Sequence, residues 1–182
     1  MRILLLSGGL DSATLLYWSL DPIDLCMSVD YGQPHAAEID AARALCELRG
    51  MPHEVATISF GSAPDSGLLG GNDETAEASV VAGRNAAFVA LAAMRGATSV
   101  MLGCNADDQA HYIDCRAHIL RSVGIACGVR VELPFVGMTK QKIVQVAKDL
   151  RVPLEQTMSC YRGTNCGECA ACQVRAGAMA AL

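Results

Sequence analysis

The sequence has few aromatic residues and no concentration of positive charge. One Trp, four Tyr and three Phe occur among 182 residues, so small and aliphatic side chains must fill the core. The formal net charge is −5, and Lys and Arg form no run along the chain. A surface that neutralises a phosphate backbone is therefore not expected, and we predict that nucleic acid is not a partner.

Long hydrophobic runs are also missing. The apolar run Ile3 to Leu6 is far shorter than the roughly 18 residues that span a bilayer, and it lacks a signal-peptide cleavage pattern. We expect a cytoplasmic protein with no membrane partner. The content of 52% hydrophobic and 18% charged residues predicts one globular domain over residues 1–182.

Strand-like and helix-like segments alternate along the chain. Short apolar runs predict strands at 2–6, 25–29, 54–58, 99–102 and 129–133. Helical spacing predicts helices at about 13–20, 36–49, 85–94 and 140–150, with Asp11-Ser12 and Thr139 as N-caps of the first and last. This order predicts an α/β fold: an open, mostly parallel sheet with helices on both faces and a ligand site at the carboxyl ends of the strands.

One stretch of the chain carries no clear periodicity. Residues 61–83 are rich in glycine and small polar side chains. This composition predicts either a mobile lid over the ligand site or a surface insertion without a role in binding.

The motif Ser7-Gly8-Gly9-Leu10-Asp11-Ser12 lies between the first predicted strand and the first predicted helix. Glycines let the backbone approach a ligand closely, and a helix N-terminus offers free N–H groups to an anion. The chain lacks both GxxxxGK[ST] and GxGxxG, which argues against a Walker-type NTPase and a dinucleotide site. SGGxDS resembles instead the PP-loop of ATP pyrophosphatases, which implies ATP and Mg²⁺.

Within this motif we assign hydroxyl donors and a carboxylate. Ser7 and Ser12 are predicted to donate hydrogen bonds to the departing pyrophosphate, and Asp11 either caps the helix or positions magnesium. The predicted ATP-binding set is Leu6, Ser7, Gly8, Gly9, Leu10, Asp11, Ser12, Ala13, Asp30 and Tyr31. The alternative is a glycine-rich turn without a ligand.

Four of the nine cysteines form a C-x5-C-x2-C-x2-C array near the C-terminus, at Cys160, Cys166, Cys169 and Cys172. Four thiolates fill the coordination shell of one tetrahedral zinc ion, so we predict a structural zinc segment at 160–172. An iron–sulfur cluster is the alternative, although its bacterial motif has a proline after the last ligand and Gln173 stands here. The other five cysteines are interpreted as small buried side chains.

The motifs together resemble the 7-cyano-7-deazaguanine synthases. The matching segments are SGGLDSA, Asp30-Tyr31-Gly32-Gln33 with His35 and Glu38, Gly83-Arg84-Asn85, Asp114-Cys115-Arg116 and the cysteine array. The resemblance covers about residues 3–175. It implies conversion of 7-carboxy-7-deazaguanine and ammonia to the nitrile through two successive adenylations, and it suggests a homodimer.

The resemblance also implies roles for further residues. Arg84 and Lys140 would meet ATP phosphates and, with Asp11 and Ser12, form the catalytic set; the alternative for both cations is solvated surface charge. The implied substrate-binding residues are Gln33, His35, Asp108, Tyr112, Asp114 and Arg116.

The segment 108–116 departs from the family pattern. Most members read D-F/Y-S-G-Y-P-D-C-R, whereas this chain reads DQAHYIDCR and lacks one aromatic ring and a Ser-Gly pair. A different acceptor carboxylate, or a reaction that stops at the amide, is the alternative. A tRNA-thiolating enzyme and a non-catalytic nucleotide sensor are further alternatives; the acidic balance argues against the first, and pyrophosphate release would exclude the second.

Overall fold

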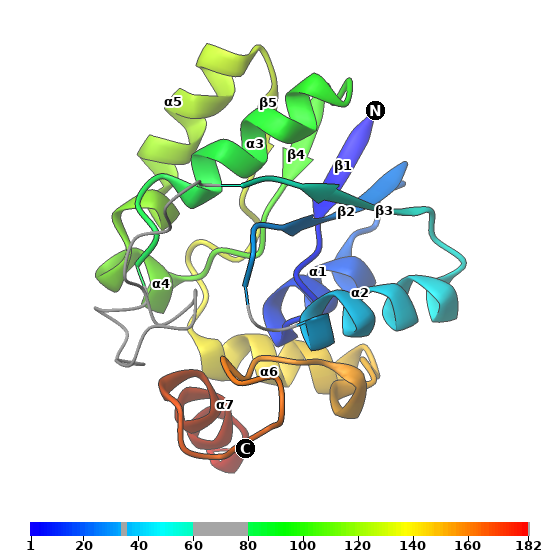
Figure 1. Ribbon diagram of the computed structural model, residues 1–182. Coiled ribbons are helices and arrows are strands. Elements are labelled where there is room, and N and C mark those ends of the chain that lie inside the picture. Colours follow the sequence, from blue (N-terminus) through cyan, green and yellow to red (C-terminus); the bar gives the residue numbers. More distant parts are fainter. Residues whose placement is uncertain (34–35, 60–79, 182) are drawn as a thin grey trace.

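The computed structural model describes residues 1–33, 36–59 and 80–181. Its centre is a parallel sheet in the order β3-β2-β1-β4-β5 (Figure 1). The strands are β1 (Arg2–Leu5), β2 (Leu25–Asp30), β3 (His53–Thr57), β4 (Ser99–Met101) and β5 (Arg130–Glu132). All four strand pairs are parallel, which confirms the predicted fold class.

Helices cover both faces of the sheet (Figure 1). One layer contains α1 (Leu10–Trp18), α2 (Ala36–Arg49) and α6 (Lys140–Asp149), and α7 (Ala170–Ala180) packs on α6. The other layer contains α3 (Arg84–Met94) and α5 (Ala117–Cys127). Between β4 and α5 lie α4 (Ala106–His111) and the 3-10 turn Ile113–Cys115, and a second 3-10 turn follows α6 at Leu154–Gln156.

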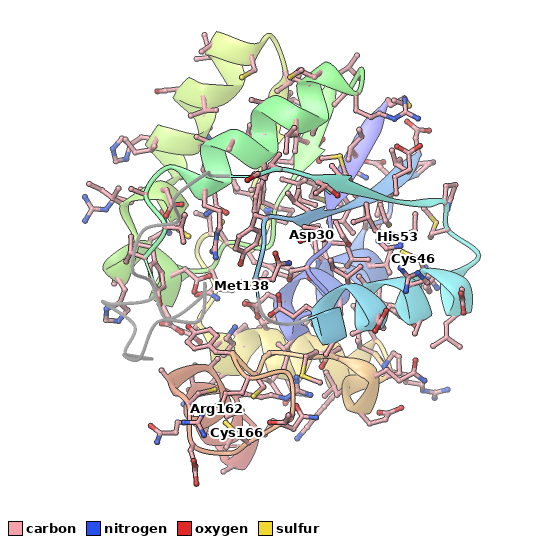
Figure 2. All side chains as sticks on the ribbon, in the orientation of Figure 1. Asp30, Cys46, His53, Met138, Arg162 and Cys166 are labelled. Atoms are coloured by element: carbon pink, nitrogen blue, oxygen red, sulfur yellow. The ribbon has the colours of Figure 1, made fainter. Side chains whose placement is uncertain are left out.

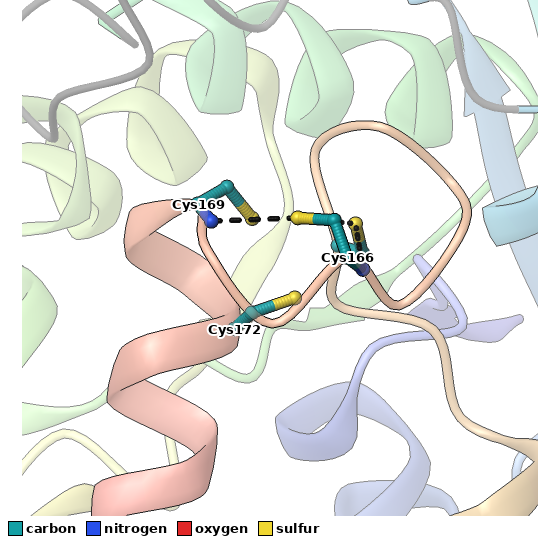
Figure 3. Close-up of side chains that lie close together, drawn as sticks. Cys166, Cys169 and Cys172 are labelled. Atoms are coloured by element: carbon teal, nitrogen blue, oxygen red, sulfur yellow. Dashed lines mark hydrogen bonds between the residues drawn. The ribbon is translucent and has the colours of Figure 1, made fainter.

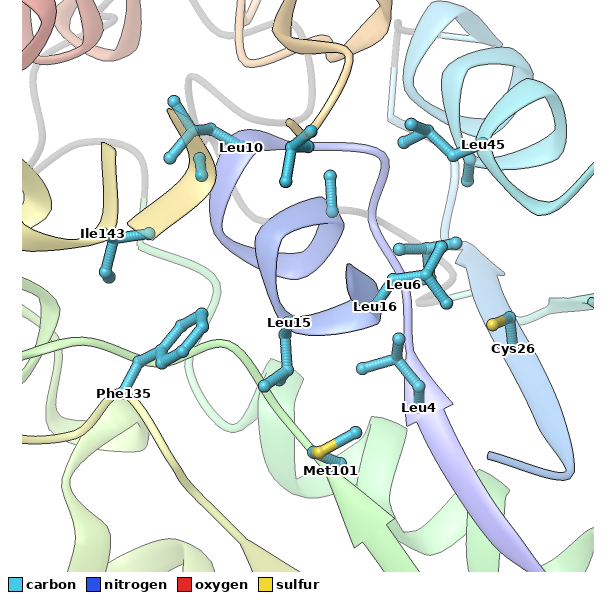
Figure 4. Close-up of a cluster of buried hydrophobic side chains, with 14 of the residues drawn as sticks. Leu4, Leu6, Leu10, Leu15, Leu16, Cys26, Leu45, Met101, Phe135 and Ile143 are labelled. Carbon is cyan, nitrogen blue, oxygen red and sulfur yellow. The ribbon is translucent and has the colours of Figure 1, made fainter. Parts of the chain in front are cut away.

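The central strand β1 is buried on both faces. Leu4 and Leu6 pack with α1, α2 and α6, whereas Ile3 and Leu5 pack with α3 and α5. Figure 4 shows the first of these two cores, where Leu4 and Leu6 face the helix that follows them. A parallel strand buried on both sides needs a continuous apolar run, which is why Arg2–Leu5 could be recognised from sequence.

Two helix starts test the predicted N-caps. The cap of α1 is Gly9 and not Asp11-Ser12, because the helix begins at Leu10 and takes both residues into its first turn. The Ser12 hydroxyl donates to the Gly9 carbonyl at 3.2 Å. The prediction for Thr139 is confirmed, since its Oγ1 accepts a hydrogen bond from the Lys142 amide at 3.3 Å.

The chain order places a switch point beside β1. The chain runs outward from β1 to β2 and β3, and then returns to add β4 and β5 on the other side. Ligands of open α/β sheets bind at the carboxyl ends of the strands where the order reverses. In the part of the chain that the structure describes, no helix combines the length and hydropathy needed to cross a bilayer.

Candidate functional site

The loop that follows β1 is built by glycine and serine. Gly8 has a φ of +82°, and a Cβ there would lie 2.2 Å from the Glu38 carbonyl oxygen, so no other residue fits. The Ser7 and Ser12 hydroxyls lie 3.0 Å apart, and Ser7 Oγ accepts from the Gly9 amide at 3.2 Å. Together with the N-terminus of α1, this loop presents hydrogen-bond donors to an anion.

The loop opens into a cavity of about 720 Å³ at the carboxyl ends of β1, β2 and β4. The cavity volume falls in the usual range for small-molecule sites. Most predicted site residues line it: Leu6, Ser7, Gly9, Leu10, Asp11, Ser12, Tyr31, Gln33, Arg84, Asp108, Tyr112 and Lys140. Arg84 and Lys140 are therefore cavity residues and not solvated surface charges.

Asp11 and Lys140 form an ion pair inside the cavity. The Lys140 ammonium contacts Asp11 Oδ2, which also accepts from Asn105 Nδ2 at 3.0 Å. Burial lowers the pKa of Lys140, but the carboxylates of Asp11 and Asp108 outweigh it and raise the pKa, so the ammonium stays charged. Asp11 Oδ1 is buried and has no hydrogen-bond partner among the described residues. A buried carboxylate oxygen of this kind fits a magnesium ion.

Asp108 lies in the first turn of the short helix α4. Its side chain accepts from the Asn105 amide at 3.2 Å while its own amide donates to Asn105 Oδ1 at 2.9 Å, which is a capping box. Burial, together with the nearby charge of Asp11, raises the pKa of Asp108 to about 6.

Arg84, like Lys140, is a positively charged residue that lines the cavity. Its Nη1 donates to the Tyr31 hydroxyl at 3.3 Å, and its guanidinium lies 5.6 Å from the Tyr31 ring centre and 6.0 Å from that of Phe88. Arg84 Nε is buried and lacks a hydrogen-bond partner within the described ranges. The rings hold the guanidinium in place, and its Nε–H can donate to an anionic ligand such as a phosphate.

Some predicted site residues lie elsewhere. Asp30, labelled in Figure 2, accepts from the Gly32 amide at 3.1 Å; Asp114 accepts from the Asn85 amide at 3.3 Å; and Arg116 is exposed. Residues outside the lining of this cavity are Gly8, Ala13, Asp30, Asp114 and Arg116. His35 lies outside the described residues, as does most of 61–83. Ligand contacts by these residues stay predictions.

Several lining residues were not assigned to the site from sequence. They are Glu38, Phe88, Ser159, Tyr161 and Arg175; Asn105, fully buried, orients Asp11 from outside the lining. Burial raises the pKa of Glu38 to about 7, against the opposing charge of Arg84. The spacing Asn105-x-x-Asp108 was a readable capping signal, whereas only the three-dimensional fold brings Arg175 to the cavity.

The four clustered cysteines form one site (Figure 3). Their sulfur atoms all lie within 4.8 Å of one another, and those of Cys160 and Cys166 are 3.6 Å apart. Sulfurs that surround zinc tetrahedrally at about 2.3 Å would be about 3.8 Å apart, so the cluster fits a metal ion of that size.

Backbone amides prepare these thiols for a metal. The amides of Arg162 and Cys166 each donate to Cys160 Sγ at 3.4 Å, and the Cys169 amide donates to Cys166 Sγ at 3.4 Å. Burial raises the pKa of Cys160, but the amide hydrogen bonds outweigh it and lower the pKa to about 6. The thiolate is the form that binds metal.

The remaining cysteines are free thiols. Cys26, Cys46, Cys104 and Cys115 are buried, as expected, whereas Cys127 is only half-buried. Cys46, labelled in Figure 2, lies on α2.

Known structures share this fold. A U34-tRNA thiolase, NcsA, from Methanococcus maripaludis matches with a TM-score of 0.53 at 16% identity, covering 99% of this chain and 71% of its own. The NMN synthetase from Francisella tularensis matches with a TM-score of 0.52 at 19% identity, covering 85% and 63%. At these identities the likeness concerns the fold alone.

Sequence relatives are much nearer. A 7-cyano-7-deazaguanine synthase from Synechococcus sp. (strain CC9605) is 35% identical over 97% of this chain and 91% of its own length. Enzymes of the same name from Porphyromonas gingivalis and Thermoplasma acidophilum are 34% and 31% identical, over 97% and 95% of this chain and 91% and 84% of their own lengths. The model of the family described as queuosine biosynthesis protein QueC matches residues 1–182. With a match over its whole length and relatives above 30% identity, the chain belongs to the QueC family.

Proposed function

We propose that this chain is an ATP-dependent C–N ligase that converts 7-carboxy-7-deazaguanine and ammonia to 7-cyano-7-deazaguanine. The supporting observation is that the phosphate loop, two cations and residues beside the tetracysteine cluster line one cavity. The names of the relatives support the choice of acceptor.

The reaction would proceed by two adenylations. A carboxylate oxygen of the acceptor attacks the α-phosphorus of ATP, and pyrophosphate leaves. Ammonia then adds to the acyl carbon, loses a proton and expels AMP, which gives the amide. The amide oxygen attacks a second ATP in the same way, and loss of AMP and the remaining N–H protons leaves the nitrile.

In this proposal the chain supplies positioning and charge and no covalent nucleophile. The hydroxyls of Ser7 and Ser12 and the loop amides hold the pyrophosphate. Lys140 and Arg84 bring positive charge to the phosphates, and Asp11 Oδ1 would hold Mg²⁺. Magnesium would neutralise charge that develops on the phosphate oxygens.

We further propose that the tetracysteine cluster holds a structural Zn²⁺. Four protein sulfurs leave no position open for a substrate, which supports a structural role. We also propose that the chain forms a single domain, assembles as a homodimer and works in the cytoplasm on small molecules and not on nucleic acid. Sedimentation of the purified protein tests the dimer.

The decisive experiment is a mass-spectrometric assay with 7-carboxy-7-deazaguanine, ATP, Mg²⁺ and ammonium. We expect AMP, amide and nitrile from the wild type, and a loss of at least about 100-fold in Asp11→Asn. Asp40→Asn is the control, because this carboxylate is exposed on α2. Accumulation of amide without nitrile would show that the reaction stops halfway, and absence of both would contradict the proposed acceptor.

A further inference from the structure

Three residues before the first metal-binding cysteine lie against the phosphate loop. We call residues 157–159 the strap. The Met158 amide donates to the Gly8 carbonyl at 2.9 Å. A Cβ on Gly9 would lie 3.6 Å from the Met158 carbonyl oxygen and 3.9 Å from Ser159 Oγ. Met158 and Ser159 also line the cavity. The strap therefore packs against the phosphate loop and forms the part of the cavity wall next to it.

Arg175 on α7 holds the strap in place. Its Nη1 donates to Thr157 Oγ1 at 2.6 Å and to the Thr157 carbonyl and Ser159 Oγ at 3.3 Å each. Its Nη2 donates to the Leu154 carbonyl at 2.6 Å. One planar guanidinium thus fixes both the turn that precedes the strap and the strap itself.

The acceptors of Arg175 are all neutral. None of the ion pairs within the described residues involves this guanidinium, and burial lowers its pKa below the usual value for arginine. A half-buried cation with neutral partners is costly, and an anion in the same cavity would offset that cost. Arg175 lines the cavity at the end that contains Gly9.

The cysteine cluster links the strap to the helix that carries Arg175. Cys160 directly follows the strap, and Cys172 lies one helical turn before Arg175 on α7. A metal bound by these sulfurs would fix the end of the strap and the start of the helix relative to each other.

We propose that Arg175 is a positioning residue for the phosphate loop. It locks the strap against Gly8 and Gly9 and places positive charge beside the bound pyrophosphate group. The tetracysteine segment is therefore part of the ATP site and not only a clamp for the C-terminal helix. The identity of the anion rests on the proposed function; the contact between strap and loop does not.

The test compares metal-loaded, full-length Arg175→Met and Arg175→Lys with the control Gln173→Met. Gln173 also lies on α7 and contacts the cysteine segment, through the Glu168 carbonyl at 3.0 Å, but it does not line the cavity. Amide hydrogen exchange is measured without nucleotide in peptides that cover residues 7–12 and, as an internal reference, β5. Metal content and thermal midpoint are measured on the same samples.

We expect the loop amides to exchange at least about tenfold faster in Arg175→Met, with little change in β5, full metal content and no change in Gln173→Met. Arg175→Lys keeps the charge and should restore part of the protection. Loop exchange equal to that of the wild type in folded, metal-loaded Arg175→Met would overturn the proposal. So would a uniform increase in loop and β5 peptides, because it would show a general loss of stability.

Binding of ATP with Mg²⁺ separates this inference from the proposed function. We expect the dissociation constant to rise about tenfold in Arg175→Met and to be unchanged in Gln173→Met. An unchanged constant in Arg175→Met would overturn the charge role. If the wild type makes no nitrile while the exchange difference is present, the proposed acceptor fails and the positioning role stands.

Discussion

At the scale of single residues, the site depends on charges that are paired inside a cavity. Asp11 and Lys140 have side chains that are only 16% and 21% exposed, and Asn105 supports the same carboxylate oxygen. Removing one partner of such a pair leaves a charge without compensation, which costs more than removing both.

We expect Lys140→Met to lower the free energy of unfolding by about 2–3 kcal/mol, because Asp11 loses its counter-ion. The double variant Asp11→Asn with Lys140→Met should lose at least about 1 kcal/mol less than the sum of the two single variants. Urea denaturation measures this coupling. The exposed pair of Arg43 and Asp40 is the control and should show weaker coupling; additive effects at Asp11 and Lys140 would contradict the pairing.

The residues of the phosphate loop could be predicted from sequence because their types and order carry the chemistry. Arg175 could not, since it reaches the site from the C-terminal helix; the capping signal of Asn105 could be read, but not its contact with Asp11. Asp114 and Arg116 match a family motif, yet here their contacts are with Asn85 and Gln109.

At the scale of secondary-structure elements, the turn between β1 and α1 allows no side chain at Gly8. A Cβ on Gly8 would meet the backbone of α2, whereas a Cβ on Gly32, after β2, would have no described atom beyond its chain neighbours within 4 Å. Both glycines have a positive φ, of 82° and 86°. Alanine substitutions at these two positions therefore separate two destabilising effects: both strain the backbone, but only the one at Gly8 adds a steric clash.

We expect Gly32→Ala to lose about 1–2 kcal/mol of stability through its backbone conformation alone. Gly8→Ala should lose more and should also abolish ATP binding, because α2 or the loop must move. Thermal unfolding and nucleotide titration of the two variants measure these effects. Equal losses in both variants would show that the contact with α2 has no influence.

A carboxylate on the edge strand β5 connects three strands. Glu132 on β5 pairs with Arg2 on β1 at 2.7 Å and accepts from the Ser99 hydroxyl on β4. The hydrogen bond from Arg2 is the largest influence on Glu132 and, although burial opposes it, lowers the pKa from 4.5 to about 2.

Because the folded-state pKa is lowered, this carboxylate stabilises the fold above pH 4.5, and the stabilisation disappears as the pH falls through 2. The full effect is about 3 kcal/mol. We expect Glu132→Gln to lose stability at pH 7 and to show a weaker dependence on pH between 4.5 and 2. Denaturation at several pH values measures this, with exposed Glu47→Gln as control; parallel pH curves for wild type and Glu132→Gln would contradict it.

The strands could be predicted from their short apolar runs, and the helices α1, α2, α3 and α6 from helical spacing of apolar residues, although α1 begins at Leu10, earlier than expected. The helices α4, α5 and α7 could not. In α5, Gly124 looks like a helix breaker, but it is required because a Cβ would lie 2.7 Å from Val131. In α7, small residues dominate, and the helix packs on α6 and contains Cys172 of the cysteine cluster.

At the scale of the whole molecule, the cysteine cluster joins the C-terminal helix to the domain. Ala178 of α7 belongs to the core shared by α1, α2 and α6. The metal would therefore support packing well beyond its four sulfurs.

We expect about one zinc ion per chain by elemental analysis, and no visible absorption. A chelator, or Cys169→Ser, should remove the metal and lower the free energy of unfolding by several kcal/mol. Cys127→Ser is the control, because Cys127 lies on α5 outside the cluster. A visible chromophore with stoichiometric iron would instead identify an iron–sulfur cluster.

The strap and the phosphate loop are in contact but far apart in sequence, so they are translated at different times. Residues 7–12 are synthesised well before residues 157–159, which contact them in the folded chain, and before Arg175, which holds residues 157–159. A nascent chain can pair β1 with β2 long before those later residues exist. The strap can therefore support the phosphate loop only after translation has passed Arg175.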